Sequence, residues 1–208
     1  KAVSTRTLKA VELPMYGDHN IQNALAAIAI ASEMGIEDNI LQCGLANFEG
    51  VKRRFTKTGE IDGITVIDDY GHHPVEIMAV LAAAREASEG QVIAIMQPHR
   101  YTRLRDLFED FCTCFNDADA VLITDVFAAG EASIKGYDRD SLVRGLRDRG
   151  HRTVMPLLDV ELLPSIVNDL SAPGDIVVFL GAGNITQLAN VLPEKLRMLR
   201  YGTDGGVE

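Results

Sequence analysis

The sequence lacks the features that mark membrane, secreted and nucleic-acid-binding proteins. No apolar run reaches the roughly 20 residues that a bilayer-spanning helix needs, and residues 1–7 are too polar for a secretory signal. The three cysteines form no even-numbered framework, which favours free thiols in a reducing cytoplasm. A net charge of −10 argues against the broad basic face that binds DNA or RNA, and against docking on an anionic membrane.

The first fifty residues look unlike the rest of the chain, whose 208 residues allow one complete domain and part of another. Residues 4–11 predict a strand. Asp18 and Asp38 are candidate caps of two helices, the first of which is expected to end at Gly35. One short strand and two helices do not close a core. Residues 1–50 are therefore expected to be the end of a domain whose beginning is absent.

From residue 51 onward, strand and helix signals alternate. A hairpin is predicted around Asp62 and Gly63, a dipeptide typical of tight turns. Two continuous apolar runs, 92–96 and 176–180, are typical of parallel strands that are covered on both faces. The expected strands are 53–60, 64–69, 92–97, 120–126, 153–157 and 175–180.

Helix signals lie between these strands. Pro74 suits a first helical position, apolar residues within 104–115 follow helical spacing, and Asp138 or Asp140 can cap a further helix. A last helix is expected over residues 185–199. The alternation predicts right-handed crossovers and an α/β fold, with a three-layer, Rossmann-like, mostly parallel sheet of about six strands, one of them antiparallel at the start.

Ionisable and aromatic residues gather where such a sheet binds ligands, beyond the carboxyl ends of its strands. Arg100 and Arg103 are the least easily explained, because cations are disfavoured at a helix amino terminus. They are either a solvated helix start or part of a site whose anionic partner offsets that cost. The planar guanidinium group suits a free carboxylate. The segments concerned are 68–74, 97–103, 127–131 and 181–184.

Other polar residues in these segments allow two interpretations. Asp68 and Asp69 can cap the next helix or take part in chemistry. His72 and His73 can be ordinary loop residues or metal ligands, although adjacent histidines splay apart in extended backbone and would need further ligands.

Two further motifs are equally open. Asn20 and Asn23 lie three apart at a helix start, where they can cap the helix or pair with the edge of adenine. Gly181 and Gly183 favour a tight strand-to-helix turn over a dinucleotide-binding loop, because Thr186 stands where that motif has its third glycine.

Taken together, four segments resemble the successive signatures of the Mur ligase family, in order and with the family's spacing, over almost the whole chain. They are residues 17–23, 48–55, 68–74 and 97–103. The resemblance implies that residues 1–50 are the end of the central ATP-binding domain and residues 51–208 the carboxy-terminal Rossmann-like domain. No Gly-x-x-x-x-Gly-Lys-Ser/Thr loop occurs, so the phosphate cradle is missing.

The resemblance also implies an activity. The forms at 68–74 and 97–103 are most similar to members that join L-alanine to UDP-N-acetylmuramate in peptidoglycan synthesis, with ATP and Mg²⁺, through an acyl phosphate. It implies a cytoplasmic enzyme with no nucleic-acid or membrane partner, and leaves the oligomeric state open. The metal ligands are implied to lie outside this chain, which alone is expected to be inactive.

Site residues follow from the same resemblance. It implies that Asn20 and Asn23 contact adenine, and that Arg54 and Asp69 close the nucleotide site, with Asp69 on the ribose hydroxyls. The amino-acid pocket is implied to be formed by Tyr70, His72, His99, Arg100 and Arg103.

Within that pocket, Arg100 and Arg103 are expected to hold the alanine carboxylate. His72 or His99 is expected to accept the amine proton, because an imidazole titrates near working pH.

Three alternatives stay open. A related ligase that recycles a preformed tripeptide usually has Phe-Ala where this chain has Tyr70 and Gly71. A non-catalytic nucleotide-binding module is compatible with the fold pattern alone. A metal hydrolase would use Asp68, Asp69, His72, His73 and His99. The last two explain neither the arginine pair nor the signature at residues 17–23.

Overall fold

The computed structural model describes residues 7–15, 17–48 and 50–202. The chain folds as two compact units, Lys1–Val51 and Lys52–Glu208. In the first unit, helix α1 (Asp18–Glu33) packs with helix α2 (Asp38–Ala46). The strand expected at residues 4–11 is not formed over 7–11, and residues 4–6 lie outside the described part.

The helices of the first unit begin one residue earlier than the cap prediction requires. Gly17 and Glu37 are the N-caps, whereas Asp18 and Asp38 are the first helical residues. That part of the prediction was wrong, although a carboxylate in the first turn is still favoured by the helix dipole. The expected end of α1 is confirmed, since Gly35 follows it with a φ of 75°.

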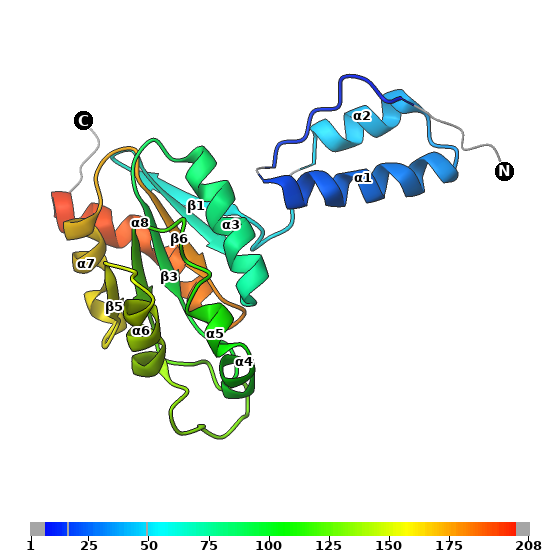
Figure 1. The fold of residues 1–208 in the computed structure, drawn as a ribbon. Helices are drawn as coiled ribbons and strands as arrows, with labels where there is room; N and C mark the ends of the chain where they lie inside the picture. Colours follow the sequence, from blue (N-terminus) through cyan, green and yellow to red (C-terminus); the bar gives the residue numbers. More distant parts are fainter. Residues whose placement is uncertain (1–6, 16, 49, 203–208) are drawn as a thin grey trace. The chain divides into compact units, whose positions relative to one another are not determined.

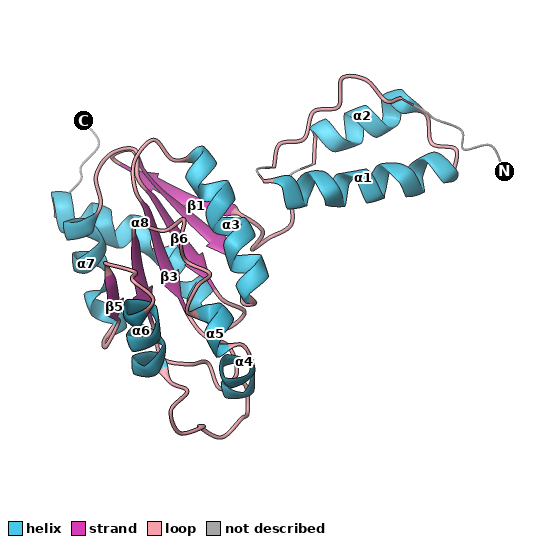
Figure 2. Cartoon of the chain, in the orientation of Figure 1, coloured by secondary structure: helices cyan, strands magenta, loops and turns pink. Residues whose placement is uncertain are grey.

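The second unit contains one six-stranded sheet in the order β1-β2-β6-β3-β4-β5. Figure 2 draws the strands of this sheet in magenta. Only the pair β1–β2 is antiparallel, and it is joined by the predicted hairpin at Asp62 and Gly63, which both have positive φ. The predicted sheet is therefore confirmed. Its strands are β1 (Thr56–Ile61), β2 (Ile64–Asp69), β3 (Val92–Met96), β4 (Ala120–Ile123), β5 (Val154–Pro156) and β6 (Ile176–Leu180).

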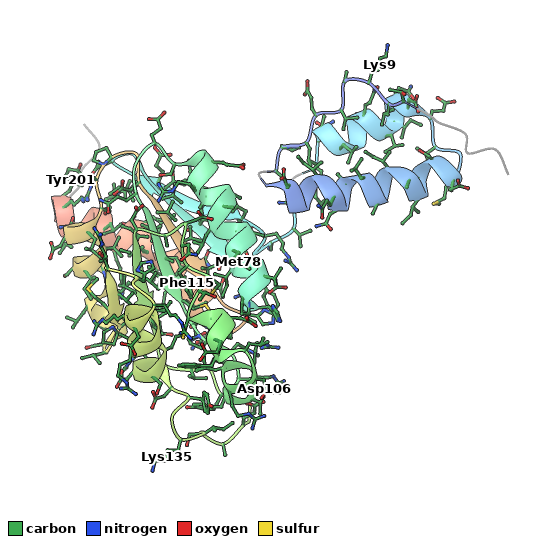
Figure 3. All side chains as sticks on the ribbon, viewed as in Figure 1. Lys9, Met78, Asp106, Phe115, Lys135 and Tyr201 are labelled. Carbon is green, nitrogen blue, oxygen red and sulfur yellow. The ribbon has the colours of Figure 1, made fainter. Side chains whose placement is uncertain are left out.

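Helices cover both faces of this sheet, as Figure 1 shows. On one face α3 (Pro74–Ala87), α4 (Tyr101–Asp106), α5 (Phe108–Phe111) and α6 (Arg139–Asp148) build the larger core, in which Phe115 (labelled in Figure 3) is fully buried. On the other face α7 (Leu163–Leu170) and α8 (Ile185–Tyr201) build a second core. No helix within the described residues is both long and apolar enough to span a membrane.

Two details of the helices differ from the sequence prediction. The helix expected over residues 104–115 is interrupted at Leu107, whose φ of −118° leaves the helical region between α4 and α5. Helix α7, preceded by a 3₁₀ turn at Val160–Leu162, was not predicted from the sequence. The Asp138 cap of α6 is confirmed, because its carboxylate accepts from the Ser141 N–H at 2.8 Å.

Candidate active site at the carboxyl rim of the sheet

Four loops leave the sheet at the same edge, because β2, β6, β3 and β4 run parallel. We call this edge the carboxyl rim. It consists of residues 70–73 after β2, 97–100 after β3, 124–138 after β4 and 181–184 after β6. The predicted gathering of ionisable and aromatic residues at this edge is therefore realised in the fold.

A row of rings crosses three of these loops. The centroids of Tyr70 and His72 are 5.2 Å apart and those of His72 and His99 are 5.7 Å apart, both edge to face. His99 in turn stacks on Phe127 at 5.4 Å. Tyr70, which is 39% exposed, and the two imidazoles thus form one continuous surface on the rim.

The two predicted arginines join this row at His99. The Arg103 guanidinium lies with Nη1 at 3.2 Å from His99 Nδ1 and at 2.9 Å from the His99 carbonyl oxygen. Arg100 has a φ of 72°, which is costly for a residue with a side chain. The Arg100 N–H donates to the Phe127 carbonyl at 2.9 Å, and this hydrogen bond holds the backbone in place. The Arg100 side chain is half-exposed.

Glu131 anchors the start of α4 and was given no role by the sequence analysis. Its carboxylate accepts from the Thr102 N–H at 2.9 Å and from the Thr102 hydroxyl at 2.6 Å, and lies 3.5 Å from Arg100 Nη1. The Thr102 hydroxyl, followed by its N–H, holds the pKa of Glu131 below the ordinary value. Arg100 therefore lies beside a fixed negative charge. The only sign of a role for Glu131 in the sequence was its position after a predicted strand.

The charge state of His99 is set by its surroundings. Burial lowers the pKa of His99, and the positive charges of Arg103, of His72 when that ring is protonated, and of Arg100 lower it further, against a smaller opposing effect of Glu131. His99 is therefore neutral at neutral pH. Since Arg103 can only donate, His99 Nδ1 accepts and the ring hydrogen is on Nε2.

Arg53 connects Tyr70, at the other end of the row of rings, to the sheet. Its guanidinium donates to the Gly181 carbonyl, lies 4.9 Å above the Tyr70 ring, and approaches the Asp68 carboxylate at 3.6 Å. Asp68 is 3% exposed and accepts from the Thr186 hydroxyl at 2.6 Å. Arg53 was missed by the sequence analysis, which singled out Arg54. No local signal marks a contact with a residue 128 positions away.

Asp69 organises the loop after β2. It is 1% exposed, and its two oxygens accept from the Phe55 N–H at 2.7 Å and the Gly71 N–H at 2.6 Å. The expected contact with ribose stays a prediction. Arg54 is exposed, and its guanidinium makes no hydrogen bond or ion pair with the described residues.

The adjacent histidines have different positions. His73 is the N-cap of α3 in a capping box with Glu76, and its side chain accepts from the Val75 N–H. His72 instead turns into the row of rings. Within the described part of the chain, no three His, Cys, Asp or Glu side chains gather as a metal site would require.

The turn after β6 has the tight form that its glycines favoured. Gln97 accepts from the Ile185 N–H at 3.2 Å through its side-chain oxygen and donates to the Asn184 side chain at 2.9 Å. A Cβ on Gly181 would lie 2.9 Å from the Gln97 carbonyl oxygen, so the close approach requires glycine there.

Two further regions are not part of the carboxyl rim. Asn20 and Asn23 belong to α1 of the first unit, where Asn20 is 6% exposed and Asn23 is exposed, so their adenine contacts stay a prediction. A cavity of about 480 Å³ lies at the opposite ends of β4 and β5, lined among others by Cys112, Arg149 and His151.

Comparison with known families identifies the second unit. Residues 53–183 match the family described as "Mur ligase, glutamate ligase domain", which is more than half of the chain. The chain belongs to the Mur ligase family. The predicted membership is therefore confirmed, and the carboxyl rim, except for Asn184, lies within the segment that the Mur ligase match covers.

Individual Mur ligases match over nearly the whole chain. A UDP-N-acetylmuramate–L-alanine ligase of Paramagnetospirillum magneticum is 58% identical over 205 residues, covering 99% of this chain and 43% of that protein. The chain thus spans less than half the length of this relative. The structure of a UDP-N-acetylmuramate–alanine ligase from Thermotoga maritima matches with a TM-score of 0.75, 27% identity and 91% of this chain covered, against 40% of its own.

A murein peptide ligase from Psychrobacter arcticus shares the fold. It has a TM-score of 0.62 and 22% identity, and covers 95% of this chain and 40% of its own. At that identity the likeness shows the fold alone.

Proposed function

We propose that the chain is the carboxy-terminal part of a cytoplasmic, ATP-dependent ligase that joins L-alanine to UDP-N-acetylmuramate in peptidoglycan synthesis. The observation that carries the proposal is the carboxyl rim itself. There, Arg100 and Arg103 lie beside a row of aromatic rings, and their guanidinium groups suit a carboxylate ligand. The 58% identity to a relative of that name supports the same reading.

The domain organisation is part of the proposal. Residues 1–50 would be the end of the ATP-binding domain, and residues 51–208 the carboxy-terminal domain. Helix α1 supports this, because its apolar side chains are poorly covered: Leu25 is 59% and Ile30 63% exposed, and Met34, the C-cap of α1, is 73% exposed. Exposed apolar residues on several sides of one helix are expected to pack against further residues of the same domain.

In the amino-acid pocket, Arg100 and Arg103 would bind the alanine carboxylate. Tyr70, His72 and His99 would line the remaining walls and place the amine next to an imidazole. Holding the amine beside the reacting carbonyl is the main contribution that such a site makes, because the acyl phosphate already carries a good leaving group.

In the nucleotide site, Asn20 and Asn23 would contact adenine, while Arg54 and Asp69 would close the site, with Asp69 on the ribose hydroxyls. The described part of the chain offers no cluster of metal ligands, and the Mg²⁺ ligands would be supplied by residues outside this chain.

The proposal is tested on the full-length ligase that contains this chain. With UDP-N-acetylmuramate we expect ADP release that depends on L-alanine, and none from residues 1–208 alone. A full-length protein that releases no ADP under these conditions contradicts the proposal.

The tripeptide-recycling ligase is the alternative to separate in the same assay. If a tripeptide is a better acceptor than alanine, the protein is the recycling ligase. One observation speaks against it: a Cβ on Gly71 would lie 2.9 Å from Asp69 Oδ1, so the loop is shaped for glycine where the recycling enzymes usually have alanine. A non-catalytic nucleotide-binding module would instead bind NAD tightly, which calorimetry measures.

A further inference from the structure

His72 holds its ring with one nitrogen and leaves the other open. Nδ1 lies 2.9 Å from the Tyr70 carbonyl oxygen and 3.4 Å from Glu76 Oε2. Both neighbours are acceptors, so Nδ1 carries a hydrogen and Nε2 of the neutral ring keeps its lone pair. Nε2 has no hydrogen-bond partner among the described residues. It does not belong to the side-chain atoms that are both buried and without a partner there. The ring therefore offers a proton acceptor on the rim.

His99 is held in the opposite sense. Its Nδ1 accepts from Arg103, so Nε2 carries the hydrogen and can only donate while the ring is neutral. The two rings are 5.7 Å apart and so share one site. Of the two imidazoles expected to take the amine proton, only His72 has a free lone pair.

Glu76 supplies a fixed negative charge behind His72. The same oxygen, Oε2, accepts from the His72 N–H at 3.0 Å and from the His73 N–H at 3.1 Å, so its position beside Nδ1 is set by the backbone. Burial acts to raise the pKa of Glu76, but these two N–H groups and the charges of His72 and Arg54 bring it below the ordinary value. Glu76 is therefore ionised at neutral pH.

We propose that His72 is the base that removes a proton from the ammonium group of the incoming amino acid, and that Glu76 is a positioning residue that stabilises the imidazolium. This rests on the ligase function proposed above. The proton passes from the ammonium nitrogen to Nε2, which leaves an amine with a free electron pair. The amine forms the C–N bond and the C–O bond to phosphate breaks. Phosphate leaves with a second amine proton, and His72 returns the first to water.

The charges around His72 explain why a carboxylate is needed there. Tyr70 and Glu76 face the ring from its own loop and from α3, and His99 faces it from the loop after β3. Arg103 is hydrogen-bonded to His99 on the same rim, and Arg100 lies 3.5 Å from Glu131 there. A proton gained by Nε2 would add a positive charge to a rim that already holds two arginines, and the ionised Glu76, 3.4 Å from Nδ1, supplies an opposite charge.

The first test needs no enzymatic activity. Long-range ¹H–¹⁵N spectra of residues 1–208 report the imidazole tautomers directly. We expect neutral His72 to carry its hydrogen on Nδ1 and neutral His99 on Nε2. Glu76→Gln should leave both tautomers unchanged, because the Tyr70 carbonyl still accepts from Nδ1. His72 found mainly with its hydrogen on Nε2 would overturn the proposal.

The second test uses the full-length ligase. Glu76→Gln keeps an oxygen for the two backbone N–H groups but removes the charge. It should lower kcat about tenfold and move the acidic limb of the pH profile about one unit to lower pH, because the imidazolium loses its partner. His72→Gln should lower kcat about a hundredfold or more.

His73→Asn is the matched control, since asparagine also caps helices and should leave the limb in place. A Glu76→Gln enzyme that loses thermal stability while its acidic limb stays fixed would make Glu76 a helix cap only. A wild-type ligase without alanine-dependent ADP release contradicts the proposed function, whereas the tautomer result tests the ring geometry independently.

Discussion

Arg103 donates through one nitrogen to both the ring and the main chain of His99, at 3.2 and 2.9 Å. This leaves the other guanidinium nitrogens of Arg103 with no hydrogen-bond partner among the described residues. A ligand carboxylate can take those donors without releasing His99. His99 therefore positions Arg103 as much as Arg103 positions His99.

Replacing Arg103 should weaken amino-acid binding. In the full-length ligase we expect Arg103→Met to raise the KM for alanine about ten- to a hundredfold, as the loss of a charged hydrogen bond of roughly 1.5–3 kcal/mol implies. Arg105→Met is the control, because this neighbour on α4 is exposed and pairs with Asp106. Equal increases in the KM values for alanine and ATP would contradict the assignment.

Glu131 should stabilise the chain only above acidic pH. Its folded-state pKa is lowered from 4.5, so its contribution is present above that value and is lost as pH falls through the folded-state pKa. Urea unfolding should therefore show Glu131→Gln less stable than the wild type at pH 7, with the difference shrinking at pH 3. A difference that is the same at both pH values would exclude the carboxylate charge as its source.

Thr186 should be needed to satisfy the buried Asp68. Thr186→Val removes the hydroxyl that donates at 2.6 Å to a carboxylate only 3% exposed. We expect a loss of about 1–3 kcal/mol in unfolding free energy. Thr186→Ser keeps the hydroxyl and should recover most of it. Serine and valine variants of equal stability would show that the hydrogen bond contributes nothing net.

Gly71→Ala should disturb Asp69. The added Cβ would lie 2.9 Å from Asp69 Oδ1, which already accepts from the Gly71 N–H. We expect a cost of about 1–2 kcal/mol, measured by thermal or urea unfolding. Gly44→Ala is the control, because a Cβ there meets nothing within 4 Å inside α2 and should be neutral or stabilising. A stable Gly71→Ala protein would mean that the loop adapts easily.

Much of the fold could be predicted because its strands are short apolar runs with clear turn residues between them. Helix α7 was missed since it is only eight residues long, Leu163–Leu170. No strong capping signal in the sequence separates the apolar residues of this helix from the strand before it. The break at Leu107 was missed because the helical spacing of apolar residues continues across it.

The site was predictable where chemistry and strand ends coincide, as at His99 and Arg103. Arg53 and Glu131 were not singled out, because their roles depend on tertiary contacts and, for Arg53, on a φ of 59° that the sequence does not show. The opposite hydrogen-bonding of the two imidazoles likewise depends on partners that only the folded chain brings together.

The strand order has a consequence for biosynthesis. The last strand in the sequence, β6, lies between β2 and β3, so those two strands cannot join one sheet until it arrives. A chain emerging from the ribosome therefore has Tyr70 and His99 on separate, incomplete pieces until Ile176–Leu180 has been translated. A chain that terminates before Ile176–Leu180 should therefore lack an assembled carboxyl rim, however much of the preceding sequence it contains.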